Sequence, residues 1–414
     1  MKICVFTLGC KVNFYESDGI INELKDLGYE VTNKLEYADI YILNTCAVTN
    51  EGERKSRQLI SRVKNLNPEA KILVCGCASQ HNKQQFVDKN VSVVMGNGFK
   101  SEIVNFINNQ SFIDDREIPK SCVDEMKTAP QRVRAYLKVQ DGCNNFCSYC
   151  LIPYVRGRSR SRKLENIISE AKYLENFCGD IVLTGINLSD FKPSLIELVE
   201  SLKDIKSRIR FGSLEVNIIT VDFMERLSKI NNICPHFHLS LQSGSNDVLK
   251  QMNRHYTKEE YLQKVDLIRK YYPFASITTH LIVGFPNETE ENFLESIQTC
   301  KNAKFFNIHC FPYSKREGTK ASLMPQILNS VKKQRVKVVE ELNEKLFLDY
   351  IELLKTNNVK QNVLLEEVVE INNKKYFVGH SEYYVKCYVD YDNNLKENDI
   401  VEVMISEKFY DGVK

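Results

Sequence analysis

Three cysteines in one short segment are the strongest chemical signal in the chain. Cys143, Cys147 and Cys150 lie in the segment DGCNNFCSYC, directly after an apolar stretch that predicts a strand. These gaps let three thiolates converge on one iron–sulfur cluster, and a complete 4Fe–4S ligand set has four cysteines. Three ligands leave one iron open, as a catalytic zinc keeps one position free. The alternatives are unrelated buried thiols and a structural zinc site. A structural zinc site requires four ligands, and no fourth Cys or His is near these three cysteines in the sequence.

A second set of cysteines comes from three separate segments. Cys10, Cys46 and Cys77 each follow an apolar run, in TLGC, LNTC and GCAS. The carboxyl ends of parallel strands meet at one edge of a sheet, so these thiols are expected to lie together. We assign Cys77 rather than Cys75 to this set, because Cys75 belongs to the apolar run and a turn residue is better placed to leave the sheet edge. From the residues alone, a second metal site and buried small hydrophobic side chains both remain open.

The elements that must position these cysteines alternate between strand-like and helix-like patterns. Residues 1–112 predict an α/β domain on a parallel sheet, and the polar residues 113–130 predict a linker. Six further strand–helix repeats over 131–354 predict a complete or partial TIM-like barrel, and residues 355–414 predict a small all-β barrel. The predicted strands are 2–7, 40–43, 71–75, 91–95, 135–139, 181–184, 208–213, 237–241, 277–283, 306–311, 363–369, 375–378, 384–389 and 401–405. The predicted helices include 17–27, 54–63, 101–107, 164–174, 261–271 and 326–354.

Composition limits the class of protein. Apolar side chains make up 43% and charged side chains 27% of the 414 residues, which is typical of a soluble globular protein. No apolar run approaches the ~18 residues of a membrane span, and no secretory signal is visible. We therefore expect a cytoplasmic protein without a membrane partner. Disulfides rarely persist in that compartment, so the 14 cysteines indicate burial, metal binding or catalysis.

The distribution of charge points to nucleic acid only locally. The chain has 56 Lys+Arg and 54 Asp+Glu, a formal net charge of +2. Residues 131–165 hold eight basic and two acidic residues, a local charge of +6, whereas residues 355–414 hold eight basic and eleven acidic residues, or −3. The basic run follows the first cysteine motif, where phosphates beside a reactive centre would need neutralising. We expect RNA contacts from Arg156, Arg158, Arg160 and Arg162, with a solvated surface as the alternative.

Polar and glycine residues follow several of the predicted barrel strands. The C-terminal ends of barrel strands usually carry the active site. The alternative is that these residues only form turns, which Gly and Ser favour without any role in function. Together with the aromatic residue that precedes the last cysteine of the first motif, they are candidates for binding a cofactor. The set is Tyr149, Thr184, Gly185, Glu215, Gln242 and Ser243.

Taken in order, these segments resemble the methylthiotransferase family of radical S-adenosylmethionine enzymes over essentially the whole chain. The resemblance rests on TLGCKVN, LNTCAVT, GCASQ, DGCNNFCSYC, IPYVRGRSRSR, HLSLQSGSNDVLKQMNR, IVGFPNET and FPYSKREGTKAS. Within the family, residues 152–161 and MNRHYT are most similar to the bacterial branch that acts on threonylcarbamoyladenosine in tRNA. Arg158 stands where the isopentenyladenosine branch usually has an acidic residue. A cobalamin-dependent radical enzyme is rejected, because none of the seven histidines has an Asp-x-His-x-x-Gly context.

The resemblance implies a reaction, its cofactors and its partners. The reaction would add a methylthio group to C2 of N6-threonylcarbamoyladenosine at position 37 of tRNA. It implies two 4Fe–4S clusters on the six cysteines, S-adenosylmethionine as radical source and methyl donor, and a cofactor shell formed by the residues that follow the barrel strands. The partners would be a tRNA anticodon stem-loop, a flavodoxin- or ferredoxin-type electron donor and a sulfur source. Isopentenyladenosine-37, a ribosomal protein side chain, or a non-catalytic cluster- or zinc-bearing RNA-binding protein remain alternatives.

The family pattern also bears on the C-terminal region and on two unusual positions. Residues 355–414 would form a TRAM domain, an OB-like barrel, and its net negative charge requires RNA contacts by stacking or hydrogen bonding from His380, Tyr383 and Tyr384. The pattern has an acidic residue where this chain has His280, and glycine where it has Asn287. This chain therefore lacks that acid for hydrogen handling, and neither residue is assigned to the site.

Overall fold

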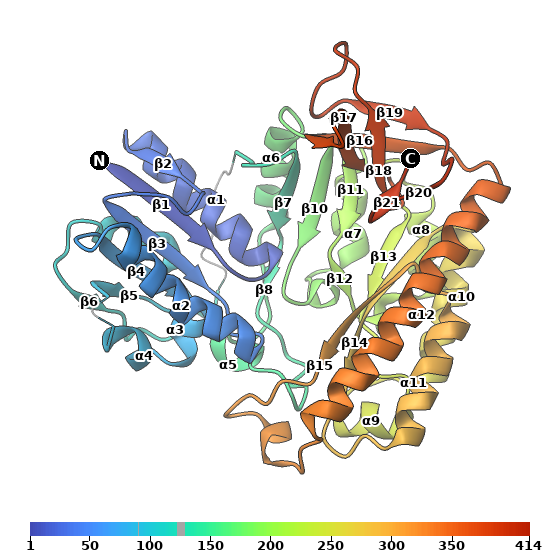
Figure 1. Ribbon diagram of the computed structural model, residues 1–414, viewed down its shortest axis with the longest axis horizontal. Coiled ribbons are helices and arrows are strands. Elements are labelled where there is room, and N and C mark those ends of the chain that lie inside the picture. Colours follow the sequence, from blue (N-terminus) through green and yellow to red (C-terminus); the bar gives the residue numbers. More distant parts are fainter. Residues whose placement is uncertain (90, 122–128) are drawn as a thin grey trace.

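The computed structural model describes residues 1–89, 91–121 and 129–414 (Figure 1). The N-terminal domain is built on a parallel sheet of order β2-β1-β3-β4-β5-β6. Its strands are β1 (Lys2–Thr7), β2 (Glu30–Thr32), β3 (Ile40–Thr45), β4 (Lys71–Gly76), β5 (Val93–Val94) and β6 (Phe112–Ile113). All strands point the same way, so β1, β3 and β4 end side by side at one edge.

Helices cover both faces of this sheet, as its continuously apolar strands predict. One face packs against α1 (Lys11–Asp26) and the 3₁₀ helix η1 (Lys100–Phe106), and the other against α2 (Asn50–Leu66), α3 (Cys77–His81) and α4 (Gln84–Val87). The helix expected at 17–27 begins six residues earlier, directly after Cys10. The sheet extends through Ile113, one residue beyond the expected domain end, and Cys122 lies outside the described residues.

The central domain is a partial barrel. Its parallel strands are β7 (Arg134–Lys138), β10 (Asp180–Thr184), β11 (Arg208–Phe211), β12 (Ser213–Leu214), β13 (His236–Leu239), β14 (Ser276–Val283) and β15 (Asn307–Pro312). Within the described part of the chain β7 and β15 do not pair, so the barrel is open on the side that faces the N-terminal domain (Figure 1). This architecture confirms the expected fold class.

Helices surround the barrel, and the segment with Cys143, Cys147 and Cys150 lies at its carboxyl end. The surrounding helices are α6 (Leu164–Leu174), α7 (Leu195–Ser201), α8 (Val221–Leu227), α10 (Lys258–Tyr271), α11 (Glu290–Ala303) and α12 (Asn329–Thr356). The carboxyl end carries a short pair of strands, β8 (Gln140–Asp141) and β9 (Arg160–Ser161), with α5 (Ile152–Val155) and α9 (Asn246–Gln251) nearby. No helix among the described residues is long and apolar enough to cross a membrane.

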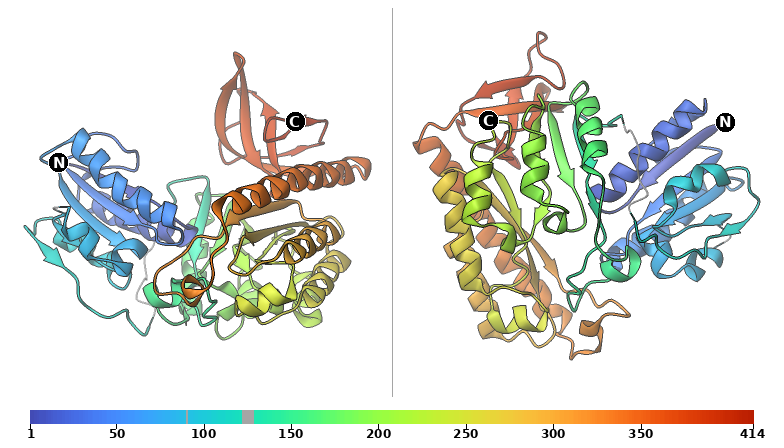
Figure 2. Two further views of the ribbon diagram at one scale, coloured as in Figure 1. Left: turned by 60° about the horizontal axis from the view of Figure 1, so that its bottom comes forward. Right: turned by 180° about the vertical axis from the view of Figure 1, so that it is seen from behind.

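The C-terminal domain is a curled sheet of order β19-β16-β17-β18-β21-β20. Its strands are β16 (Gln361–Ile371), β17 (Lys374–His380), β18 (Lys386–Asp390), β19 (Ile400–Val403), β20 (Lys408–Phe409) and β21 (Gly412–Val413). The tight turn between β16 and β17 uses Asn372 and Asn373, both at left-handed φ (51° and 60°), which asparagine tolerates better than most residues. Figure 2 shows this sheet above the barrel and α12.

Candidate functional site

The structure brings Cys10, Cys46 and Cys77 to one edge of the N-terminal sheet. They follow β1, β3 and β4, which are neighbours in the sheet. Gly9 allows the close approach, since its φ is +116° and a Cβ there would lie 3.2 Å from the Cys46 Sγ. The thiols are near enough to affect one another's pKa. Burial, reinforced by Cys77, raises the pKa of Cys46 to about 12, and the pKa of Cys10 is raised by desolvation, opposed by Arg156 and reinforced by Cys77.

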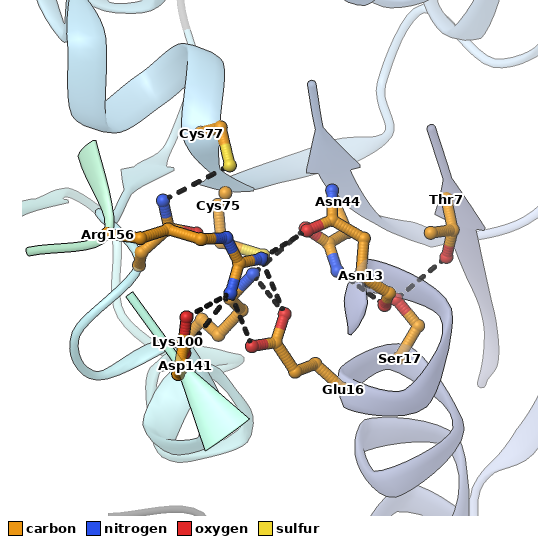
Figure 3. Close-up of polar contacts among 12 residues, drawn as sticks. Thr7, Asn13, Glu16, Ser17, Asn44, Cys75, Cys77, Lys100, Asp141 and Arg156 are labelled. Atoms are coloured by element: carbon orange, nitrogen blue, oxygen red, sulfur yellow. Dashed lines mark hydrogen bonds and ion pairs between the residues drawn. The ribbon is translucent and has the colours of Figure 1, made fainter. Parts of the chain in front are cut away.

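Cys75 and Cys77 lie in different surroundings. Cys75 is fully buried among apolar side chains on the α1 face of the sheet, and burial raises its pKa to about 12. Cys77 begins α3, and its Sγ accepts a hydrogen bond of 3.3 Å from the Asn97 Nδ2. Figure 3 shows Cys77 above the buried polar cluster that surrounds Arg156. These surroundings support Cys77 as the ligand, because a donor directed at sulfur favours a thiolate.

Cys143, Cys147 and Cys150 share one loop after β8. Backbone N–H groups of Asn145 and Ile152 donate to the Sγ atoms of Cys143 (3.5 Å) and Cys150 (3.4 Å). The Arg254 guanidinium donates to the Cys147 Sγ at 3.3 Å. All three thiols therefore have donors suited to thiolates. Burial, reinforced by Cys147, raises the pKa of Cys150 to about 12 and that of Cys143 to about 11, so a bound metal must displace their protons.

Both triads suit a cluster better than a single ion. Among residues 1–89, 91–121 and 129–414, no three His, Cys, Asp or Glu side chains are arranged to hold one metal ion. The irons of a 4Fe–4S cluster lie apart from one another, so its thiolate ligands are more widely spaced than the ligands of one zinc ion. Among the described residues each place holds three thiols suited to binding, while Cys75 beside Cys77 is buried in the apolar core, and this donor set fits a cluster with an open iron.

The cofactor-shell candidates divide into two groups. Thr184 ends β10, and its buried Oγ1 has no hydrogen-bond partner among the described residues, so it is available to a ligand. Glu215 accepts hydrogen bonds from Arg254 and Asn145 and lines a cavity of about 260 Å³. Ser243, in contrast, is fully buried, and its Oγ accepts a hydrogen bond from the Ser245 N–H. This contact supports a structural role for Ser243 in the turn.

The remaining three candidates shape the same end of the barrel. A Cβ on Gly185 would lie 2.9 Å from the Gln140 Oε1, so glycine permits close packing there. The Tyr149 ring packs edge-on against Phe285 at 6.5 Å between centroids. Gln242 has a left-handed φ of 65°, and its N–H donates to the His280 carbonyl. Asn287 is also left-handed, at 64°, which explains why glycine suits this position in the family pattern.

The structure contradicts the expectation of RNA contacts for two of the four arginines. Arg156 is 1% exposed and Arg162 is 5% exposed, and both guanidinium groups are held inside the protein. Arg162 donates to Glu170 at 2.7 Å. Arg160 is half-buried and donates to backbone carbonyls, whereas Arg158 is exposed, with its guanidinium 4.3 Å from the centre of the Phe146 ring. Of the four, only Arg158 remains a candidate for phosphate.

Arg156 belongs instead to a buried ionic cluster between the N-terminal domain and the barrel (Figure 3). It donates to Glu16 and Asp141 at 3.1 and 3.0 Å and to the Asn13 Oδ1 at 2.6 Å. Glu16 also pairs with Lys100 at 2.5 Å and with Lys138 at 2.8 Å. Burial alone would raise the pKa of Glu16, but these three cations hold it well below its usual value. We call Glu16, Lys100, Lys138, Asp141 and Arg156 the interdomain cluster.

The interdomain cluster also connects the two cysteine sites. Arg156 follows Cys150 by six residues, and its charge acts on the thiols of Cys10 and Cys77. Among the described residues, Arg160 also pairs with Asp141 at 3.6 Å, so basic side chains outnumber Glu16 and Asp141 beside the N-terminal triad. An excess cation stabilises thiolates.

The C-terminal aromatic residues also lie elsewhere than expected. The Tyr384 ring stacks between His380, at 4.8 Å, and His236 of β13, at 4.7 Å between centroids. Arg134 lies beside the Tyr384 ring at 5.2 Å. The Tyr383 carbonyl accepts a hydrogen bond from the Ser276 hydroxyl at the start of β14. Tyr384 and His380 therefore fasten the domain to the amino end of the barrel, so their stacking faces are not free for RNA.

Sequence comparison adds family information to this geometry. A family model described as the Radical SAM superfamily matches residues 137–300, and one described as Uncharacterized protein family UPF0004 matches residues 2–96. The threonylcarbamoyladenosine tRNA methylthiotransferase MtaB of Bacillus subtilis is 37% identical over 93% of this chain and 89% of its own. The protein of the same name in Aquifex aeolicus is 37% identical, over 91% and 97%. A tRNA-2-methylthio-N(6)-dimethylallyladenosine synthase of Thermoanaerobacter sp. is 36% identical, over 89% and 83%.

Solved structures share the fold at low sequence identity. The radical S-adenosylmethionine methyltransferase TsrM of Kitasatospora setae, with cobalamin and a 4Fe–4S cluster bound, has a TM-score of 0.58 at 13% identity, over 78% of this chain and 77% of that one. The cobalamin-dependent radical enzyme OxsB has a TM-score of 0.52 at 13% identity, over 83% and 56%. At such identities the likeness concerns the fold alone.

Proposed function

Because the chain belongs to the family of radical S-adenosylmethionine tRNA methylthiotransferases, we propose that it adds a methylthio group to C2 of N6-threonylcarbamoyladenosine at position 37 of tRNA. Family membership makes the chain a transferase that uses S-adenosylmethionine and 4Fe–4S clusters. The assignment of threonylcarbamoyladenosine as the substrate is supported by similarity, at 37% identity over most of the chain, to relatives whose names contain it. Relatives named for dimethylallyladenosine follow at 36%, so isopentenyladenosine-37 is the second candidate.

The proposed division of labour follows the two triads. When bound, the cluster at Cys143, Cys147 and Cys150 would supply reductive cleavage of S-adenosylmethionine, and the cluster at Cys10, Cys46 and Cys77 would carry the sulfur that is transferred. Radical chemistry suits this target, because an adenine C2–H is neither acidic nor readily displaced. Residues 1–112 would hold the sulfur site, 131–354 the radical site, and 355–414 would contribute to RNA binding.

The protein's own side chains orient the reactants. Arg254 donates to both Cys147 and Glu215, so it ties the radical triad to the 260 Å³ cavity. The free Thr184 Oγ1 can accept from the amino group of S-adenosylmethionine. The interdomain cluster holds the two domains in one mutual position, which is what transfer between two sites requires.

The proposed partners follow from the chemistry. They are the anticodon stem-loop that contains position 37, a flavodoxin- or ferredoxin-type donor for the reducing electron, and a source of sulfur. The proposed site of action is the cytoplasm, where tRNA is modified. Arg158 is the proposed phosphate contact beside the radical triad.

Anaerobic reconstitution with iron and sulfide tests this proposal. The purified chain is given S-adenosylmethionine, a reductant and tRNA carrying threonylcarbamoyl- or isopentenyladenosine-37, and the nucleosides are analysed by mass spectrometry. We expect a methylthio product from the first tRNA and about eight iron atoms per chain. Cys150→Ala should abolish 5′-deoxyadenosine formation, whereas Cys46→Ala should keep it and lose the methylthio product. Product from the isopentenyl tRNA alone would assign the second substrate instead.

A further inference from the structure

Among the described residues, four histidines line the inner face of the open barrel. His236 stacks on Tyr384 at the amino end, and the other three are used by neither cysteine site. His238, His280 and His309 come from the adjacent strands β13, β14 and β15, and His280 is paired in register with His309. The ring centroids lie 4.2 Å apart for His238 and His280, and 5.6 Å apart for His280 and His309. Their sequence neighbours pack against the surrounding helices in the apolar core, so the imidazoles face the lumen. We call these residues the histidine row.

The histidine row runs from the interior of the barrel to solvent. His238 is 8% exposed, His280 is half-buried, and His309 is exposed at the open side. The His238 Nδ1 pairs with the Thr278 Oγ1 at 2.9 Å, whereas its buried Nε2 has no hydrogen-bond partner in the part of the chain that the structure describes. A buried polar atom without a partner is costly, and the lumen can be reached from outside. This combination indicates a place for a polar ligand group.

The charge around the histidine row is positive. Lys11 directly follows Cys10 at the start of α1, and its ammonium acts on all three rings. Within the described residues Lys11 has no hydrogen bond or ion pair. Burial lowers its pKa, and Arg134, Arg210 and the carboxylate of Asp180 also act on its charge. No carboxylate is among the groups that shift the pKa of the three rings. Burial, reinforced by His309 and Lys11, lowers the pKa of His280 to about 4. The rings are thus neutral near pH 7, where they can both donate and accept hydrogen bonds.

The position of the row relates it to the reacting centre. Lys11 is the immediate neighbour of Cys10 in the sulfur site. On the other side, the His280 carbonyl accepts from the N–H of Gln242, which follows the barrel strand on the S-adenosylmethionine side. Lys11 and the His280 carbonyl thus connect the histidine row to residues next to both sites.

We propose that Lys11 and the histidine row bind the carboxylate-bearing substituent on N6 of the substrate adenosine. The inference rests on the proposed function and deepens it, because it names the contacts that select the substrate. A threonylcarbamoyl group carries a carboxylate for the Lys11 ammonium, and a hydroxyl and amide groups for the imidazoles. An isopentenyl group carries none of these, and it would leave the polar side chains buried without partners. Sites built to hydrogen-bond a substrate reject an analogue that lacks the polar groups.

Binding of RNA to the full-length, cluster-loaded protein tests the proposal. Three anticodon stem-loops that differ only at position 37 carry threonylcarbamoyladenosine, isopentenyladenosine or adenosine, and fluorescence anisotropy gives each Kd anaerobically. Lys11→Gln and His309→Ala are compared with Lys337→Gln, an exposed lysine of α12 on another part of the surface. We expect each test substitution to weaken binding of the threonylcarbamoyl RNA about tenfold, the loss of one hydrogen bond to a charged group, and to leave adenosine RNA unchanged. Lys337→Gln should leave all three values as in the wild type.

The outcomes separate the inference from the function on which it rests. If Lys11→Gln weakens all three RNAs equally and lowers the salt dependence of binding by about one ion, Lys11 contacts a phosphate and the inference is wrong. If both variants keep the wild-type preference, the histidine row plays no part in selection and the inference is again wrong. If the wild-type protein itself binds isopentenyl RNA at least as tightly as threonylcarbamoyl RNA, the proposed substrate fails, whatever the variants do. Iron content and the absorption of the clusters confirm that each variant is folded and loaded.

Discussion

Replacing Glu16 by Gln should uncouple the N-terminal domain from the barrel. Glu16 lies on α1, is 2% exposed, and contacts Lys100, Lys138 and Arg156 at 2.5 to 3.1 Å. Glutamine keeps the shape but removes the charge, so Lys100, Lys138 and Arg156 would each lose an ion pair with a buried carboxylate. Breaking a buried ion pair by removing one partner costs about 3–5 kcal/mol. The cost falls on the contact between domains, because Glu16 belongs to one domain and Lys138 and Arg156 to the other.

Urea unfolding monitored by circular dichroism measures this effect. The chain has no tryptophan, so far-ultraviolet circular dichroism and tyrosine fluorescence serve as the two probes. We expect Glu16→Gln to move the first unfolding transition to a lower urea concentration, equivalent to a loss of about 3 kcal/mol or more in the free energy of unfolding. The N-terminal domain should then unfold in a transition separate from that of the rest of the chain. Glu23→Gln, the same substitution on the same helix at a half-buried residue without an ion pair among the described contacts, should change stability by about 0.5 kcal/mol or less.

The pH dependence gives a second check with a definite sign. The cations hold the pKa of Glu16 well below its ordinary value of 4.5, so its contribution to stability is fully present above pH 4.5. That contribution is lost as the pH falls through the lower pKa of the folded state. The difference between wild type and Glu16→Gln should therefore be constant from pH 6 to 8 and shrink in acid. A change below about 1 kcal/mol at pH 7, with one unsplit transition, would refute this account of the interdomain cluster.

Three further predictions concern single residues. Cys77→Ala should lower the iron content by about four atoms per chain, whereas Cys75→Ala should keep about eight, because Cys75 is a core residue; equal losses would show that Cys75 is also a ligand. Arg158→Ala should weaken tRNA binding for all sequences and lower the salt slope by about one, as expected for an exposed phosphate contact; an unchanged slope would remove it from the interface. His280 should titrate near pH 4 by nuclear magnetic resonance of the imidazole, since burial and its neighbouring cationic and imidazole groups disfavour its charged form. A value near 6.5 would show that the lumen is well solvated.

The sequence predicts most of the framework because the strands are short apolar runs in parallel sheets. The runs before Cys10, Cys46 and Cys77 mark three strands that prove to be neighbours, and their cysteines therefore meet. The start of α1 is missed for a physical reason. Its first turns bury Asn13 and Glu16, polar side chains that an apolar periodicity cannot detect, because they face charged groups of the barrel.

The arginine run shows what a single sequence does not contain. In the sequence, Arg156 belongs to a basic run that is typical of a solvated or RNA-binding surface. In the structure it is buried and pairs with Glu16, which lies 140 positions earlier in the chain. Spacing along the chain carries no information about such a pair. The same holds for the histidine row, whose members are dispersed over three strands and meet only when the barrel forms.

Mass spectrometry of tRNA nucleosides tests the central claim most directly. A bacterial strain that lacks its methylthio-threonylcarbamoyladenosine activity receives this gene, its Cys150→Ala variant or its Cys46→Ala variant. We predict that the intact gene alone restores 2-methylthio-N6-threonylcarbamoyladenosine, and that the level of methylthio-isopentenyladenosine is unaffected. Failure of the intact gene to restore the mark, despite a soluble product loaded with about eight iron atoms, would contradict the claim, as would restoration by either cysteine variant.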